Sequence, residues 1–143
     1  MEGTRVLTND RKRILLADDH AAMLEEVENV LKGDYNIVGS VEDGAALVEA
    51  AQRLQPDLII SDISMPVMNG FEAAAKLRAA GVTTKLIFLT VQSTAPYVKK
   101  ARALGALGYV LKAYTTEYLP AAVSAVLAGG SYICPQLPQD AWR

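Results

Sequence analysis

The sequence has little of what marks secreted, membrane-spanning or nucleic-acid-binding chains. Its only cysteine, Cys134, cannot form a disulfide within the chain, which fits a reducing compartment. No apolar run approaches the ~18 residues of a membrane span, and the polar N-terminus has no signal-peptide segment. The net charge is −2, and the densest basic cluster, residues 11–13, is short. We therefore expect a cytoplasmic protein that makes no direct contact with nucleic acid or membrane.

Hydrophobic residues, by contrast, are abundant and regularly spaced. They make up 51% of the 143 residues, enough for the core of one domain. Short apolar runs predict five strands, and amphipathic stretches with cap or stop residues predict five helices. The strands are expected at 13–17, 35–41, 58–61, 85–89 and 107–111, and the helices at 20–32, 45–54, 68–80, 94–104 and 115–128.

This alternation predicts the fold class and the domain limits. Strands that alternate strictly with helices favour an α/β protein with a doubly wound parallel sheet covered on both faces. A five-stranded sheet of this kind commonly has the flavodoxin-like order 2-1-3-4-5. We expect this domain over residues 13–133, a flexible tail over 1–12, and a linker or C-terminal tail over 134–143, where prolines occur without periodicity.

Polar side chains follow four of the predicted strands. Asp18 and Asp19 come directly after the first strand, Asp62 after the third, Thr90 after the fourth and Lys112 after the fifth. In a parallel sheet these strand ends share one edge, where ligands bind, and the switch point lies between the first and third strands. We therefore expect the five side chains to gather at one site.

Such a set of side chains predicts a site for a divalent cation and a phosphoryl group. Neighbouring carboxylates repel one another, by about 4 kcal/mol for a pair ~4 Å apart at an effective dielectric of ~20, unless one is protonated or a cation binds. Oxygen ligands with room for water and phosphate favour Mg²⁺. Lys112 and Thr90 can contact phosphoryl oxygens, and Asp62 can act as the nucleophile.

Each of these residues also has a purely structural explanation. The acids and Thr90 can cap the helices that follow them, and Lys112 can be a surface lysine. His20, next to the acidic pair, can be a metal ligand or a base, but an exposed histidine at a helix start is the simpler interpretation. Three acids on neighbouring strands make capping alone the weaker explanation.

Four stretches of the chain resemble the receiver domain of two-component response regulators. They are residues 15–20, with Ala17-Asp18-Asp19-His20, residues 57–70, with Ser61-Asp62-Ile63-Ser64-Met65-Pro66-Val67-Met68-Asn69-Gly70, then Leu89-Thr90, and residues 105–113, with Tyr109-Val110-Leu111-Lys112-Ala113. The acidic start, and Gly129-Gly130-Ser131-Tyr132-Ile133 at the end, are most similar to regulators of the NarL/LuxR type.

The resemblance implies a phosphorylation-controlled signalling switch rather than a turnover enzyme. Asp62 would accept a phosphoryl group from a phosphohistidine of a sensor kinase, and Thr90 and Lys112 would contact its oxygens. The Mg²⁺ ligands would be Asp62, Asp19 and the backbone carbonyl of Ser64, with Asp18 assisting, partly through water.

The resemblance also implies how a signal would leave the site. Tyr109 would be the aromatic switch residue, which rotates inward when Thr90 moves toward the phosphoryl group. The affected surface, roughly residues 94–128, would bind an output domain, a second receiver or the kinase. Whether the protein forms a homodimer stays open.

Two departures from the family pattern matter. Many receivers have a proline after the lysine, joined by a cis peptide bond, whereas this chain has Ala113, for which a cis bond would cost about 3–4 kcal/mol. Regulators of this type usually continue into a helix-turn-helix domain that controls transcription. The chain stops at Arg143, so we expect either a fragment of such a regulator or a stand-alone receiver.

Two other functions are compatible with parts of the pattern. An Mg²⁺-dependent phosphatase with an aspartate nucleophile would commonly have a second acid two residues on, where this chain has Ser64. A flavin-binding module would need a phosphate-cradling loop after the first strand, where Asp18 and Asp19 would repel the flavin phosphate.

Overall fold

The structure, a computed structural model, describes residues 11–143 and has one parallel sheet between two layers of helices. Among these residues the sheet has six strands in the order β2-β1-β3-β4-β5-β6, and every neighbouring pair is parallel. The flavodoxin-like order of the first five strands is therefore confirmed. The tail predicted for residues 1–12 lies, up to residue 10, outside the described residues.

The predicted strands all form within one residue of their expected limits. They are β1 Arg13–Ala17, β2 Asn36–Val41, β3 Leu58–Ser61, β4 Lys85–Thr90 and β5 Gly108–Leu111, and β6 Tyr132–Ile133 follows them. The strands β1, β3 and β4 are buried almost throughout. Burial on both faces explains why these strands are continuous apolar runs in the sequence rather than alternating ones.

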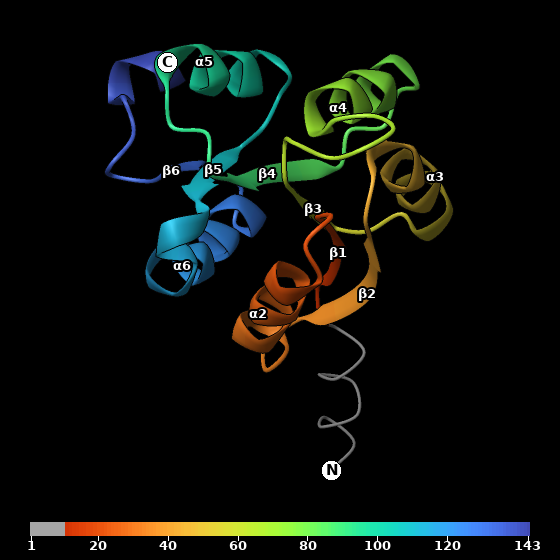
Figure 1. The fold of residues 1–143 in the computed structure, drawn as a ribbon. Coiled ribbons are helices and arrows are strands. Elements are labelled where there is room, and N and C mark those ends of the chain that lie inside the picture. Colours follow the sequence, from red (N-terminus) through yellow and green to blue (C-terminus); the bar gives the residue numbers. More distant parts are fainter. Residues whose placement is uncertain (1–10) are drawn as a thin grey trace.

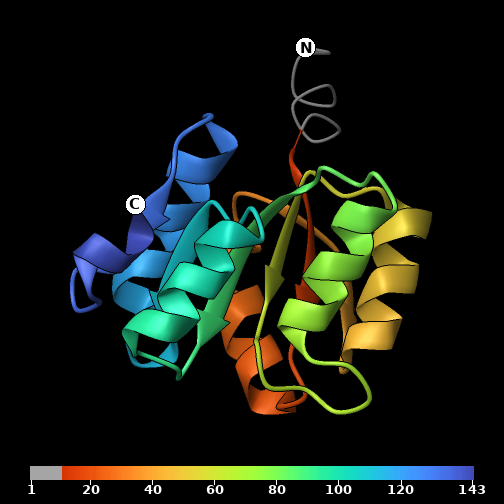
Figure 2. The same ribbon diagram turned by 90° about the horizontal axis from the view of Figure 1, so that it is seen from above.

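The helices lie on both faces of the sheet, as Figures 1 and 2 show. Those on one face are α2 Ala21–Leu31 and α6 Thr115–Leu127, and those on the other are α3 Gly44–Leu54, α4 Gly70–Ala79 and α5 Ala95–Ala103. Predicted and observed limits differ by at most two residues, as is usual at frayed helix ends. Over residues 11–143 no helix is long and apolar enough to cross a membrane.

Two hydrophobic clusters fill the space between the sheet and its helices. Leu15, Ile59 and Phe88 point toward α3, α4 and α5, whereas Leu16 and Ile60 point toward α2 and α6. Successive strand residues face opposite sides of a sheet, so each buried strand contributes to both clusters. This packing fixes the strand ends, and with them the edge where the polar residues lie.

The sheet has a sixth strand, so the prediction of five strands was one short. β6 pairs with β5, with Tyr132 opposite Gly108 and Ile133 opposite Tyr109. Two residues are too few to show the periodicity from which a strand is predicted.

The residues after β6 also differ from the predicted linker or tail. They include the short 3-10 helix η2, Gln139–Trp142. The side chains of Cys134, Leu137, Ala141 and Trp142 are buried in the cluster on the α5 side of the sheet. Prolines interrupt the periodicity here, but packing against the domain orders the segment.

The peptide bond between Lys112 and Ala113, which the sequence left open, is trans, since residues 11–143 contain no cis peptide bond. Lys112 begins the 3-10 helix η1, Lys112–Tyr114, which precedes α6. The hydroxyl of Thr115 donates to the Lys112 carbonyl across 2.7 Å, which closes this turn at the start of α6.

Candidate functional site

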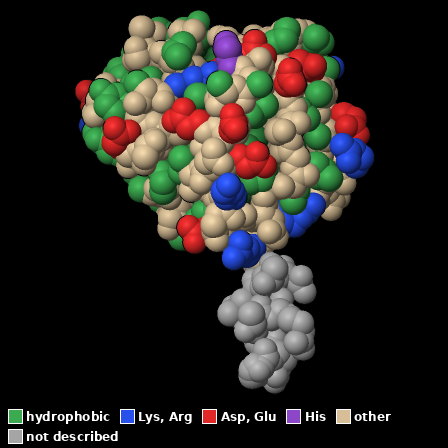
Figure 3. Space-filling model, turned by 60° about the horizontal axis from the view of Figure 1, so that its bottom comes forward, with side chains coloured by type: hydrophobic (Ala, Val, Ile, Leu, Met, Phe, Trp, Pro, Cys, Tyr) green, Lys and Arg blue, Asp and Glu red, His purple; other side chains and the backbone are tan. Residues whose placement is uncertain are grey.

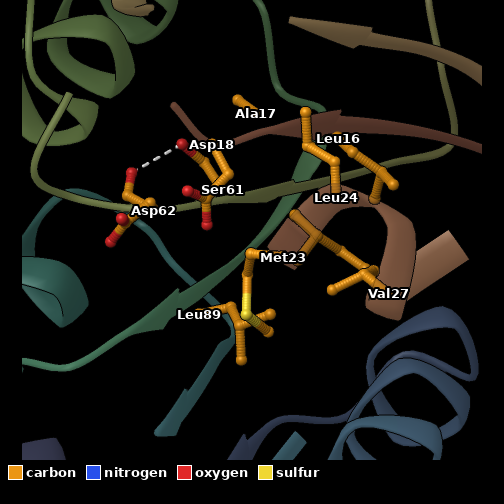
Figure 4. Close-up of a pocket in the computed structure, with 10 residues that line it drawn as sticks. Leu16, Ala17, Asp18, Met23, Leu24, Val27, Ser61, Asp62 and Leu89 are labelled. Carbon is orange, nitrogen blue, oxygen red and sulfur yellow. Dashed lines mark hydrogen bonds between the residues drawn. The ribbon is translucent and has the colours of Figure 1, made fainter. Parts of the chain in front are cut away.

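Backbone hydrogen bonds between strand ends fix the position of Asp62. Its N–H donates to the carbonyl of Ala17, at the end of β1, across 2.8 Å. Its carboxylate Oδ1 accepts from the N–H of Ile63 across 2.7 Å. Asp18, the residue after β1, therefore lies beside Asp62, as Figure 4 shows. Each of these two aspartates is only 4% exposed, so their charges are largely removed from water.

The loop from β3 to α4 is closed by Asn69 and Gly70. Asn69 caps α4, because its side-chain oxygen accepts from the N–H of Glu72, whose carboxylate in turn accepts from the Asn69 N–H. The Gly70 N–H donates to the carbonyl of Ile63 across 2.7 Å. A Cβ at position 70 would collide with the carbonyl oxygen of Asp62. Glycine is therefore required for the loop to return close to Asp62.

Lys112 links the two buried aspartates. Its Nζ lies 2.8 Å from Asp18 Oδ2 and 2.8 Å from Asp62 Oδ2. Burial alone would lower the pKa of Lys112, but hydrogen bonds to the two carboxylates and their charges outweigh burial and raise the pKa above its ordinary value. Lys112 therefore keeps a positive charge inside the site.

Asp19 and His20 form the outer rim of the site. The side chain of Asp19 is 32% exposed and that of His20 is 68% exposed. His20 precedes α2 as its N-cap residue, and Figure 3 shows the single histidine of the chain at the surface. Its Nδ1 nevertheless lies 3.1 Å from Asp18 Oδ1 and 3.1 Å from Asp19 Oδ1. The histidine is thus exposed as expected, and it also contacts the acidic pair.

The acidic side chains lie close enough together to share a cation. One ligand atom from each of Asp18, Asp19, His20 and Asp62 lies within 4.8 Å of the others. Carboxylate oxygens are the ligands that hard divalent cations such as Mg²⁺ prefer, so the donor set fits such an ion. Ser64, whose backbone carbonyl is a further predicted ligand, lies in the loop two residues after Asp62 and is exposed.

Thr90 and Tyr109 lie on the α5 side of the site and are connected through Gln92. Thr90 ends β4, the strand between β3 and β5, and its hydroxyl accepts from the Gln92 N–H across 3.3 Å. The Tyr109 hydroxyl donates to the Gln92 carbonyl across 2.8 Å. Tyr109 is fully buried, and burial, with smaller contributions from Tyr97 and Asp62, raises its pKa. Gln92 acts through its backbone, so its side-chain type gave no signal in the sequence.

The comparisons with known proteins agree with this geometry. The family model of the response regulator receiver domain matches residues 14–124. The chain belongs to this family. The receiver domain of NarL from Mycobacterium tuberculosis superimposes with a TM-score of 0.79 at 31% identity, over 83% of this chain and 98% of that one. A LuxR-family response regulator from an Aurantimonas species gives a TM-score of 0.86 at 26% identity, over 92% of this chain and 96% of that one.

Curated relatives of this receiver domain are longer than the chain. The transcriptional regulatory protein DegU of Brevibacillus brevis is 35% identical over 135 residues, which are 92% of this chain and 57% of the relative. The response regulator GacA of Pseudomonas aeruginosa is 31% identical over 90% of this chain and 61% of its own length. The chain thus spans somewhat more than half of these relatives. The resemblance to NarL/LuxR-type receiver domains of two-component systems is confirmed.

Proposed function

We propose that this receiver domain is a phosphorylation-controlled switch in which Asp62 accepts a phosphoryl group from a sensor histidine kinase. The observation that supports this most directly is the position of the Asp62 carboxylate. It lies at the carboxyl end of β3, beside the acid that follows β1, and 2.8 Å from the ammonium of Lys112. A nucleophilic carboxylate with a fixed cation beside it suits phosphoryl transfer, which needs positioning and charge neutralisation above all.

The transfer step needs no other nucleophile from this chain. A carboxylate oxygen of Asp62 attacks the phosphorus of the kinase phosphohistidine, and an acyl phosphate forms as the P–N bond breaks. The imidazole leaves with the electron pair of that bond. Lys112, whose Nζ is 2.8 Å from Asp62 Oδ2, would contact the oxygens that gain charge. The Thr90 hydroxyl accepts from the Gln92 N–H, so its own proton is free to be donated to one of these oxygens.

Mg²⁺ would be held by Asp19, Asp62 and the Ser64 carbonyl, with Asp18 assisting. The ion would neutralise the carboxylates and the phosphoryl oxygens at the same time. Lys112 contacts both Asp18 and Asp62, whereas Asp19 contacts only His20 among the basic residues at the site. This division favours Asp19 as the carboxylate most available to a cation.

The relatives favour a role in transcription. DegU is named a transcriptional regulatory protein, and GacA is named a response regulator. We infer that a phosphorylated form of this receiver acts through a DNA-binding output domain or a second receiver, and that the partner contacts residues 94–128.

The first experiment is mass spectrometry of the intact protein treated with acetyl phosphate. We expect one phosphoryl group with Mg²⁺ present and strong loss of labelling with EDTA or in Asp19→Asn. Asp34→Asn, which changes an exposed acid in the turn after α2, is the matched control and should label like the wild type. Labelling at the full rate in EDTA would contradict the role of the cation. In a separate assay, turnover of an external phosphomonoester would favour a phosphatase instead.

A further inference from the structure

The end of the chain returns to the switch side of the domain. The Tyr132 N–H donates to the Leu107 carbonyl across 2.9 Å, and the Cys134 N–H donates to the Tyr109 carbonyl across 3.0 Å. Residues 132–133 pair with β5, and the chain then continues to η2, which lies beside α5 at the dark-blue end of the ribbon in Figure 1. Without β6, the strand β5 that carries Tyr109 would be an edge strand with unpaired backbone groups. The segment therefore covers the backbone of the proposed switch residue.

Helix α5 packs on the sheet through Val98 and Ala101, and it also contacts this segment. The helix has nine residues, and Thr94, at its N-cap position, makes no side-chain capping bond. The 3-10 helix η2 lies close beside α5. The guanidinium of Arg102 on α5 lies 4.8 Å from the ring centroid of Trp142, a cation–π contact. The segment thus contacts α5 through η2 and Trp142.

A continuous set of hydrogen bonds joins this segment to the site. The Thr90 hydroxyl bonds the Gln92 N–H, the Gln92 carbonyl accepts from the Tyr109 hydroxyl, and the Tyr109 carbonyl accepts from the Cys134 N–H. The loop that contains Gln92 leads directly into α5, which contacts η2. A change at Thr90 can therefore reach residues 132–142 both through Tyr109 and through α5.

The docked segment includes one unfavourable feature. The indole N–H of Trp142 is buried, and among the described residues it is the one buried side-chain polar atom without a hydrogen-bond partner. A buried donor without a partner costs free energy, which offsets part of the gain from burying the ring. The segment is also short, and its strand β6 contributes two residues at the edge of the sheet, so it can open while β1 to β5 stay paired.

We propose that residues 132–142 form a latch on β5 and α5 whose docking is thermodynamically linked to the state of Asp62. This inference rests on the proposed function, because it assigns the output of the same switch. The docked latch pairs with the backbone of Tyr109 while the Tyr109 ring is buried, and a phosphoryl group bonded to Thr90 would favour this buried position of the ring. Phosphorylation therefore tightens the latch. By linkage, opening the latch weakens binding of the phosphoryl group by the same factor.

Two readouts test this latch without altering the site. Amide hydrogen exchange of a peptide covering residues 132–142 reports its opening, and acrylamide quenching of Trp142, the only tryptophan, reports exposure of its ring. Beryllofluoride with Mg²⁺ serves as the phosphoryl mimic, and its binding is followed independently by fluorine NMR. We expect exchange in this peptide to slow by about fivefold or more on binding of the mimic, the scale of ordinary allosteric coupling.

A pair of variants on α5 completes the test. Arg102→Ala removes the contact with Trp142, so it should increase exchange and quenching and weaken beryllofluoride binding. Lys99→Ala, an exposed position on the same helix, should leave all three unchanged. Two results would overturn the latch alone. One is unchanged exchange over 132–142 although beryllofluoride is bound. The other is unchanged beryllofluoride affinity in Arg102→Ala although the latch has opened. A wild-type protein that binds no beryllofluoride would contradict the proposed function as well.

Discussion

Lys112 reaches across the end of β4 to bond Asp62. Lys112 follows β5 and Asp62 follows β3, with β4 between these strands, yet Nζ and Oδ2 are 2.8 Å apart. Thr90, the last residue of β4, therefore lies between the ends of the strands that carry the two charged residues. The proposed phosphoryl acceptor and its two proposed contact residues thus come from three consecutive strands of the sheet.

Lys112→Ala should destabilise the protein at neutral pH when no divalent cation is present. The substitution leaves Asp18 and Asp62 buried without their shared cation, and breaking a buried pair in this way costs about 3–5 kcal/mol. Mg²⁺ should restore part of the loss, because it neutralises the same carboxylates. Urea unfolding with and without Mg²⁺ measures both effects, with Lys99→Ala as the control. A variant as stable as the wild type in EDTA would show that the ion pair contributes nothing.

Stability should fall as the pH rises above about 10. The pKa values of Tyr109 and Lys112 are raised in the folded protein above their ordinary values of 10.0 and 10.5. At alkaline pH the unfolded chain loses these protons first, so it binds fewer protons than the folded chain and the free energy of unfolding decreases. Below these ordinary values both contributions are fully present. Unfolding measured between pH 7 and about pH 11 should show a smaller loss in Tyr109→Phe than in the wild type.

The sequence predicted most of the sheet and the centre of the site, for a physical reason. Buried parallel strands are continuous apolar runs, and a polar residue directly after such a run must lie at the sheet edge. Asp18, Asp62 and Lys112 could therefore be placed before the structure was known, and these three are in direct contact.

The parts that were not predicted depend on tertiary contacts rather than on local patterns. Strand β6 has two residues, and Trp142 is buried by its contact with α5, a helix about forty positions earlier in the chain. Gln92 takes part through its N–H and carbonyl, which every residue except proline provides. The contact of His20 with both neighbouring acids depends on the side-chain conformation at the start of α2.

Thr90→Ala should accept a phosphoryl mimic but transmit its effect poorly. A complete reversal of a 1:99 population needs about 5.5 kcal/mol, and one charge-assisted hydrogen bond supplies about 1.5–3 kcal/mol. Thr90 therefore carries part of the coupling to Tyr109, and Lys112 and the cation carry the rest. In NMR spectra, beryllofluoride should shift the amides of residues 90–110 in the wild type and in Thr90→Ser, and much less in Thr90→Ala. Equal shifts in Thr90→Ala would rule out this route.

Gly70→Ala should destabilise the loop that holds Asp62. The added Cβ collides with the Asp62 carbonyl oxygen, so the backbone must move, at a cost of about 1–3 kcal/mol. Gly33→Ala is the matched control, because a Cβ there meets nothing within 4 Å. We expect a lower midpoint of thermal unfolding and slower acetyl phosphate labelling in Gly70→Ala only. Equal behaviour of the two variants would mean that the loop adapts freely.

The central claim is that Asp62 is the phosphorylated residue, and borohydride reduction tests it at the level of a single side chain. Borohydride converts an aspartyl phosphate to homoserine, which peptide mass spectrometry locates in the sequence. After acetyl phosphate treatment with Mg²⁺, the account predicts homoserine at position 62 and at no other aspartate, and none in Asp62→Asn. Homoserine at another acid in the wild type, with Asp62 unmodified, would contradict the account.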